Sequence, residues 1–218
     1  MIERLRLWLD QEARSGPENM AVDEWLLDGS REPVLRVYRW QPGWGSFGYF
    51  VSRREAAGIL PGLRLVRRWT GGGVVDHRHD WTYSLVVPRG GSLAERRGAA
   101  SYATIHEALA GALREEGVVA GLAADSGPTR GGECFRRAVA HDLVDASGNK
   151  LAGAGQRRNA RGLLHQGSVA LAGSGRRAER LACRLAGRVV VDDSNPEQRR
   201  LEEILAKRYA PDEWTWRR

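Results

Sequence analysis

The sequence predicts an α+β domain, and two kinds of observation predict it. Short β-rich runs bounded by glycine and proline recur between residues 34 and 87 and return near residue 163. Between and after these runs, apolar residues recur at helical spacing. Clusters of strands with helices interspersed are typical of α+β domains. A length of 218 residues suits one domain, so we expect a single domain over residues 1–218.

The helices are predicted from their start signals and their apolar spacing. The segment Ser-Gly-Pro-Glu at residues 15–18 is a helix-start signal, and apolar residues follow at helical spacing as far as Gly29. A second helix is predicted over residues 101–116 and ends before Gly117. Two further helices are predicted over residues 179–185 and 197–209.

The strands are predicted where β-rich runs lie between turn signals. A Ser-Gly-Asn turn at residues 147–149 predicts a hairpin that pairs residues 142–145 with residues 150–153. Residues 89–98 and 126–132 have the composition of loops. The other predicted strands cover residues 34–40, 46–50, 63–69, 81–87 and 163–171.

The composition excludes several classes of protein. Apolar residues make up 42% of the chain and charged residues 28%, so a disordered protein is excluded. The first ten residues hold no uninterrupted apolar stretch, so we expect no signal peptide, no membrane partner and a cytoplasmic protein. Two cysteines, Cys134 and Cys183, cannot form a disulfide framework, so we expect reduced thiols and no metal site.

The net charge of +7 indicates an acidic partner. Arginines are spread along the whole chain and form no basic block, so we do not expect nucleic acid as that partner. Small acidic carrier domains fit the charge equally well.

Lys150 is the first candidate for chemistry. It is one of only two lysines in a chain that otherwise uses arginine, and a small-residue run follows it. A lysine ammonium is a compact charge whose pKa moves when it is partly buried, whereas arginine stays protonated. The alternative is a solvated residue of the hairpin turn.

A glycine triplet, Gly71 to Gly73, follows two arginines at the end of a predicted strand. Glycines let backbone amides approach a ligand, and adjacent arginines recognise anions. The segment has neither the Walker A pattern nor the dinucleotide-binding spacing. The alternative is a glycine-rich hairpin turn.

Three further segments are candidates. His77 and His79 would lie on the same side of an extended strand, where His77 faces a substrate or accepts a hydrogen bond. Cys134 follows two glycines and would be a nucleophile if its thiol pKa were lowered, or else an inert buried thiol. His165 and Gly167 interrupt an apolar strand, as happens where backbone borders a pocket.

Taken in order, these segments resemble the lipoate-protein ligase A and octanoyltransferase family. The similarity covers nearly all of residues 19–171. The matching segments are Asn19-Met20-Ala21-x-Asp23-Glu24, Leu35-Arg36-x-Tyr38-x-Trp40, Ser46-x-Gly48-Tyr49-Phe50, Arg67-Arg68-x-Thr70-Gly71-Gly72-Gly73, His77, Thr82-Tyr83-Ser84, Cys134-Phe135, Lys150-x-x-Gly153 with Gln156, and Gly167-Ser168.

The resemblance implies a mixed, mainly antiparallel sheet flanked by helices, similar to the catalytic domain of biotin protein ligases. It also implies attachment of an octanoyl or lipoyl chain to a lysine of a carrier domain. A transferase takes octanoyl from acyl carrier protein through a cysteine thioester and needs no cofactor. A ligase activates lipoate with ATP and Mg, and typical ligases carry a C-terminal accessory domain, which we do not expect here. The Cys-Phe dipeptide and the chain length favour the transferase.

The resemblance assigns roles residue by residue. Cys134 would be the nucleophile, and Lys150 would lie beside the acyl carbonyl. Cys183 has the spacing of a core residue and is the fallback nucleophile. The expected acceptors are lipoyl carrier domains, such as the glycine cleavage H protein or dehydrogenase E2 subunits. The residues expected to border the substrate are Arg68, Gly71, Gly72, Gly73, His77, Gly153, His165 and Gly167.

Three departures leave alternatives open. Gly73 stands where transferases with a Cys-Phe motif carry arginine, and a longer His-Arg-His-Asp segment replaces the usual His-Asp. His165 and Gln166 are in swapped order. A short ligase that works with a separate accessory protein, or a binding module without activity, therefore remains an alternative.

Overall fold

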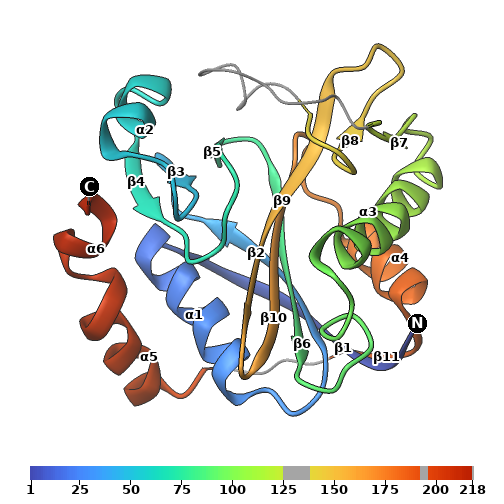
Figure 1. Ribbon diagram of the computed structural model, residues 1–218, viewed down its shortest axis with the longest axis horizontal. Helices are drawn as coiled ribbons and strands as arrows, with labels where there is room; N and C mark the ends of the chain where they lie inside the picture. Colours follow the sequence, from blue (N-terminus) through green and yellow to red (C-terminus); the bar gives the residue numbers. More distant parts are fainter. Residues whose placement is uncertain (125–137, 192–195, 218) are drawn as a thin grey trace.

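The computed structural model describes residues 1–124, 138–191 and 196–217, and it is built around one large sheet (Figure 1). The sheet has eight strands in the order β11-β1-β2-β6-β10-β9-β8-β7. These strands are β11 (Ala186–Val191), β1 (Ile2–Arg14), β2 (Val34–Trp40), β6 (Trp81–Pro88), β10 (Gly162–Val169), β9 (Lys150–Asn159), β8 (Leu143–Val144) and β7 (Gly121–Leu122).

The sheet is mixed but mainly antiparallel. Strand β1 runs parallel to both of its neighbours, β11 and β2. The five pairings from β2 across to β7 are all antiparallel. The predicted fold class is therefore confirmed.

A second, three-stranded sheet carries the glycine triplet. Its order is β4 (Arg64–Arg67), β3 (Trp44–Phe47) and β5 (Val74–Asp76), with β3 parallel to β4 and antiparallel to β5. Residues 68–73 connect β4 to β5. The small sheet thus holds both ends of the glycine-rich loop.

Helices cover both faces of the large sheet, so the core has two parts. On one face, α3 (Gly98–Arg114) and α4 (Gly175–Leu185) pack against apolar side chains that include Leu35, Leu85 and Leu163. On the other face, α1 (Gly16–Gly29) and α5 (Gln198–Ile204) pack against the adjacent strand residues Val34, Val86 and Leu164. Neighbouring strand residues point to opposite faces, and both faces are buried.

The first predicted helix is confirmed as α1. Ser15 is its N-cap, and the side chains of Ser15 and Glu18 form a capping box. The helix predicted over residues 197–209 is divided into α5 and a π-helical turn, η2 (Leu205–Tyr209). Two short helices, α2 (Arg53–Ile59) and α6 (Asp212–Trp216), are not among the predicted elements.

Strands β1 and β11 are also not among the predicted elements. In β1, buried and exposed positions alternate only irregularly, because a charged residue stands at many positions. Strand β11 pairs with β1 from the far end of the chain, and such long-range pairing leaves little local signal. Within the described residues, we find no helix whose length and apolar character would let it cross a membrane.

Candidate functional site

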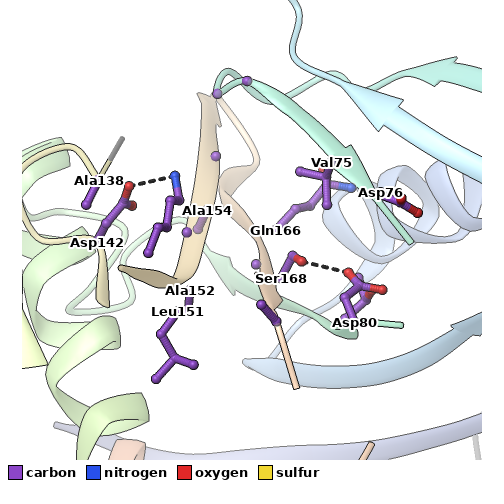
Figure 2. A pocket seen from close by; sticks show the side chains of 18 of the residues that line it. Val75, Asp76, Asp80, Ala138, Asp142, Leu151, Ala152, Ala154, Gln166 and Ser168 are labelled. Atoms are coloured by element: carbon purple, nitrogen blue, oxygen red, sulfur yellow. Dashed lines mark hydrogen bonds and ion pairs between the residues drawn. The ribbon is translucent and has the colours of Figure 1, made fainter. Parts of the chain in front are cut away.

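A cavity of about 1040 Å³ lies between the glycine-rich loop and strands β5, β9 and β10. Figure 2 shows that Asp142 and Asp80 lie on opposite sides of the strands that carry Ala154 and Gln166. A cavity of this size is ample for a small organic ligand. Seven of the residues expected to border the substrate or act on it line this cavity, namely Arg68, Gly72, Gly73, His77, Lys150, Gly153 and Gly167.

The glycine-rich loop packs against backbone so closely that side chains are excluded. A Cβ on Gly155 of β9 would lie 2.3 Å from the carbonyl oxygen of Gly71. Gly72 has a φ of +89°, a conformation that favours glycine. The loop is also anchored by Thr70, whose Oγ1 donates to Oε1 of Gln166 at 2.7 Å. The loop therefore forms a fixed wall of the cavity.

Arg68 is a buried cation in this wall. Its side chain donates to Oγ of Ser46 at 2.7 Å and to the carbonyl oxygens of Gly71 and Gly73 at 3.2 and 2.9 Å. Burial lowers the pKa of Arg68 to about 10, so the guanidinium still carries its charge at neutral pH. Among the described residues, no carboxylate forms an ion pair with it. The arrangement suits an anionic or carbonyl oxygen in the cavity.

His77 is fixed by a chain of hydrogen bonds. Its Nε2 lies 2.6 Å from Oγ of Ser46, and its Nδ1 lies 2.8 Å from Oδ2 of Asp80. The ring also stacks on Trp40 at 3.8 Å between centroids. The Asp80 carboxylate accepts further hydrogen bonds from Ser168 and Thr82. His77 therefore presents a fixed imidazole edge to the cavity.

The acidity of Asp80 follows from these contacts. Burial by itself would raise the pKa of Asp80. The charge and hydrogen bond of His77, with the hydroxyls of Ser168 and Thr82, outweigh burial and hold that pKa below its usual value. Asp80 is thus a carboxylate that keeps its charge while buried.

The prediction that His77 and His79 share one side of a strand is wrong. Strand β5 ends at Asp76, so both histidines lie in the loop that follows it. His77 turns inward and is buried, whereas His79 is exposed. Asp76 pairs with Arg78 in this loop, which explains why the chain leaves the extended conformation.

Lys150 lies at the start of β9 and enters the cavity beside a buried carboxylate. Its Nζ is 2.7 Å from Oδ2 of Asp142, whose side chain is 1% exposed against 30% for Lys150. Asp142 also accepts hydrogen bonds from the hydroxyl of Tyr102 and, at 2.9 Å, from the backbone N–H of Val139. Burial and the charge of Asp142 raise the pKa of Tyr102, so this hydroxyl stays protonated and donates. Lys150 is not the solvated turn residue of the alternative interpretation.

The backbone before Asp142 is held in an unusual conformation. His141 has a φ of +70°, in the left-handed region that few non-glycine residues adopt. Its carbonyl oxygen accepts from Nδ1 of His106 at 2.7 Å, and its N–H donates to Ala123 at 3.1 Å. These two contacts hold the turn and so aim Asp142 at Lys150.

His165 does not line the cavity, which corrects the expectation that it borders the substrate. It lies under α3, where Nε2 is 3.1 Å from the hydroxyl of Tyr83 and Nδ1 is 3.1 Å from the amide of Gln156. The swap in sequence order explains this, because adjacent strand residues point to opposite faces and Gln166 faces the cavity instead. Gly71 is likewise absent from the lining and faces β9.

Of the two cysteines, Cys183 lies within the described residues and Cys134 does not. Cys134, the candidate nucleophile, lies outside the described residues, as does the predicted loop at residues 126–132. Cys183 is exposed on α4, so its assignment to the core is wrong. The apolar face of α4 that packs on the sheet is formed by Ala178, Leu181, Ala182 and Leu185.

Sequence inspection missed Asp142 and Tyr102. A signal for Asp142 existed, because the predicted hairpin pairs residues 142–145 with residues 150–153 and so brings Asp142 near Lys150. Tyr102 lies in the helix predicted over residues 101–116, and nothing in that pattern marks it as a site residue. Within the described part of the chain, no three histidine, cysteine, aspartate or glutamate side chains are grouped to hold a metal ion.

The fold and this site define a protein of the lipoyl ligase class, and comparison with known proteins agrees. The family model described as "Lipoyl protein ligase A/B catalytic domain" matches residues 15–198. The chain therefore belongs to the lipoyl protein ligase A/B catalytic domain family, as the resemblance indicates.

Individual relatives are similar over most of this chain. The octanoyltransferase LipM of Symbiobacterium thermophilum is 35% identical over 176 residues, which cover 74% of this chain and 63% of the relative. The octanoyltransferase LipM of Moorella thermoacetica is 35% identical over 164 residues, covering 69% of this chain and 59% of the relative. The chain thus spans about three fifths of the length of these relatives.

Solved structures share the fold. A lipoate-protein ligase A bound with ATP has a TM-score of 0.74 and 19% identity, and the match covers 99% of both chains. A bipartite lipoate protein ligase from Thermoplasma acidophilum has a TM-score of 0.72 and 18% identity, covering 98% of this chain and 96% of the other. At sequence identities of 18–19%, the similarity to these structures shows that the fold is shared.

Proposed function

We propose that this protein is an acyltransferase that moves an octanoyl or lipoyl group onto a lysine of a lipoyl carrier domain. The observation that carries the proposal is the position of Lys150, whose ammonium enters a 1040 Å³ cavity beside the glycine-rich loop. The family match and the octanoyltransferase relatives support the same reaction class. Acyl carrier protein is the proposed donor.

The proposed reaction has two steps. In the first, the Cys134 thiolate attacks the carbonyl carbon of the donor thioester. A bond forms to the enzyme sulfur, the bond to the carrier sulfur breaks, and the released carrier thiolate takes up a proton. In the second, the neutral amine of an acceptor lysine attacks the acyl-enzyme. The amide bond forms, the bond to Cys134 breaks, and the amine proton passes to the leaving sulfur.

Charge develops on the carbonyl oxygen in both steps. The Lys150 ammonium is the group that would stabilise it, because it lies in the cavity and is only partly exposed. The pair with Asp142 fixes the position of this ammonium but also offsets its charge. We therefore assign Lys150 mainly to stabilising the oxyanion.

The remaining cavity residues would hold the acyl chain and its polar end. Arg68 and the backbone of Gly72 and Gly73 are proposed to contact oxygen atoms of the substrate, since Arg68 is buried without a carboxylate partner among the described residues. His77 and Gly153 line the same space.

A second candidate function is ATP-dependent lipoate ligation. It is favoured by the cationic Arg68 and by Gly72 with its φ of +89°, because such a wall suits a phosphate as well as a carbonyl oxygen. If ATP binds here, Arg68, Lys150 and the glycine-rich loop would hold its phosphates. ATP would then supply the activation of the carboxylate.

Intact-mass spectrometry separates the two functions. The protein is mixed with octanoyl acyl carrier protein, and separately with lipoate, ATP and Mg. We expect a mass increase of one octanoyl group with the first mixture, removed by hydroxylamine and absent in Cys134→Ser. Cys183→Ser is the matched control and should keep the adduct. Acyl transfer that requires ATP and survives in Cys134→Ser would establish the ligase instead.

A further inference from the structure

Three arginines and three aromatic side chains form a closed ring beside the glycine-rich loop. Arg157 lies over Trp69 and Tyr49, with 4.8 and 5.5 Å between the guanidinium carbon and the ring centroids. We call the whole set the cationic ring. Its other contacts are those of Arg208 with Trp69 and Trp214 at 4.4 and 4.7 Å, and of Arg217 with Tyr49 and Trp214 at 4.1 Å each.

Among the described residues, one of the three arginines of this ring is paired with an acid. Arg208 pairs with Glu24 at 2.9 Å. Within the described residues, the guanidiniums of Arg157 and Arg217 form no ion pair with a carboxylate, and they are held by the aromatic faces. An aromatic face holds a guanidinium without neutralising its charge, whereas a carboxylate partner would neutralise it. Two fixed guanidiniums are therefore available to an acidic ligand.

The ring members are partly exposed, as a binding surface requires. Phe50 extends this surface, because it is 85% exposed and its ring lies 5.0 Å from that of Tyr49. Arginine, tyrosine and tryptophan are the side chains that dominate the energetics of protein interfaces. The surface thus combines positive charge with an apolar edge, which suits an acidic protein segment.

The ring adjoins the cavity wall. Trp69 directly precedes Thr70, and the backbone N–H of Tyr49 donates to the carbonyl of Thr70 at 2.9 Å. Arg157 follows the cavity residue Gly155 by two positions on β9. Arg157 lies seven positions after Lys150 on the same strand, a distance of about 23 Å at roughly 3.3 Å per residue.

We infer that the cationic ring is a docking surface for the acidic carrier domain that donates the acyl group. The inference rests on the proposed acyl transfer. A donor thioester sits at the end of a long, flexible phosphopantetheine arm, so a donor domain docked on the ring can extend its carbonyl along β9 towards Lys150. An acceptor lysine needs a domain seated at the cavity mouth itself.

The test measures binding apart from chemistry. Calorimetry gives the Kd of the full chain for acyl carrier protein, and transfer rates are measured with octanoyl acyl carrier protein and with octanoyl pantetheine, which lacks a carrier domain. We expect Arg217→Glu and Arg157→Gln to weaken carrier binding at least tenfold. We also expect them to keep the pantetheine rate within about twofold. Arg176→Glu, an exposed residue of α4 on the other face of the sheet, is the control and should change neither quantity.

Other results overturn the inference. Unchanged carrier binding in both ring variants does so directly, and so does an equal loss of rate with both donors, which would indicate a structural role. Tight, ring-dependent binding of an oligonucleotide at physiological salt, with carrier binding unchanged, would assign the surface to nucleic acid. Absence of transfer from both donors in the wild-type chain removes the proposed function, yet the Kd values still decide the docking surface.

Discussion

The ammonium nitrogen of Lys150 lies 2.7 Å from Oδ2 of Asp142, and the two residues differ greatly in exposure. The side chain of Asp142 is 1% exposed, whereas that of Lys150 is 30% exposed. A buried carboxylate loses its hydration, so it holds a nearby cation firmly. Asp142 therefore fixes the direction in which the more exposed Lys150 points.

The first prediction concerns this pair. Asp142→Asn keeps the shape of the side chain but removes its charge, so the Lys150 ammonium loses its anchor. We expect kcat for acyl transfer to fall about 10- to 100-fold, with a smaller change in KM, since positioning acts mainly on the transition state. Steady-state kinetics with octanoyl acyl carrier protein measure both quantities.

Two lysine variants test whether the reaction needs the ammonium of Lys150 or only a positive charge at that position. Lys150→Arg should also be nearly inactive, because a planar guanidinium cannot replace a compact ammonium at the same point. Lys207→Arg, at an exposed position, should behave as wild type. An Asp142→Asn protein with normal kcat would show that the ion pair has no part in the reaction.

The second prediction concerns the wall of the cavity. Gly155→Ala places a Cβ 2.3 Å from the carbonyl oxygen of Gly71, so the loop must move. Overpacking of this kind costs about 1–3 kcal/mol of the free energy of unfolding, which urea denaturation measures. Gly71→Ala is the matched control, because its Cβ would meet nothing within 4 Å. Equal stability of the two variants would contradict the close packing described here.

The third prediction concerns pH. Burial lowers the pKa of His106 to about 4 and that of His165 well below its usual value of 6.5. The folded state thus binds fewer protons than the unfolded state between these values. Both groups stabilise the fold fully above pH 6.5, and this contribution is lost as the pH falls, for His106 between about 6.5 and 4.

Urea unfolding at several pH values measures this loss. Each histidine adds up to about 1.4 kcal/mol per pH unit to the slope of the unfolding free energy. His106→Phe removes one of the two groups and should reduce the slope by about half. Because it also removes the hydrogen bond to His141, its stability at pH 8 is expected to be lower. A slope equal to that of wild type would refute the assignment.

Local signals in the sequence predicted much of the fold. The capping box at Ser15 and the periodic apolar positions of α3 are properties of neighbouring residues, so they are visible in one sequence. Strands β1 and β11 pair across almost the whole chain. That pairing depends on tertiary packing, which no window of neighbouring residues contains.

The candidate site likewise combines residues that local sequence signals identify with residues that only tertiary packing identifies. Lys150, Arg68 and the glycine triplet stand out by residue type and spacing, and the structure brings Lys150, Arg68, Gly72 and Gly73 to one cavity. His165 and Gln166 could not be assigned by type, because strand alternation decides which one faces the cavity. Tyr102 belongs to a distant helix, and its contact with Asp142 arises only when α3 packs on the sheet.

The last prediction concerns Arg67, which joins the end of the chain to the turn beside the glycine-rich loop. Its buried guanidinium donates to five carbonyl groups, those of Tyr49, Val51, Trp214, Thr215 and Arg217. Lysine cannot satisfy five acceptors from one point, so Arg67→Lys should lower the free energy of unfolding by about 2–4 kcal/mol.

The same change should release α6, because three of the five acceptors lie in residues 214–217. Limited proteolysis is therefore expected to cut Arg67→Lys faster near the C-terminal end than wild type. Arg64→Lys, in the same strand but at an exposed position, is the control and should be cut at the wild-type rate. Equal cleavage of all three proteins would show that the packing of Trp214, and not Arg67, holds this segment in place.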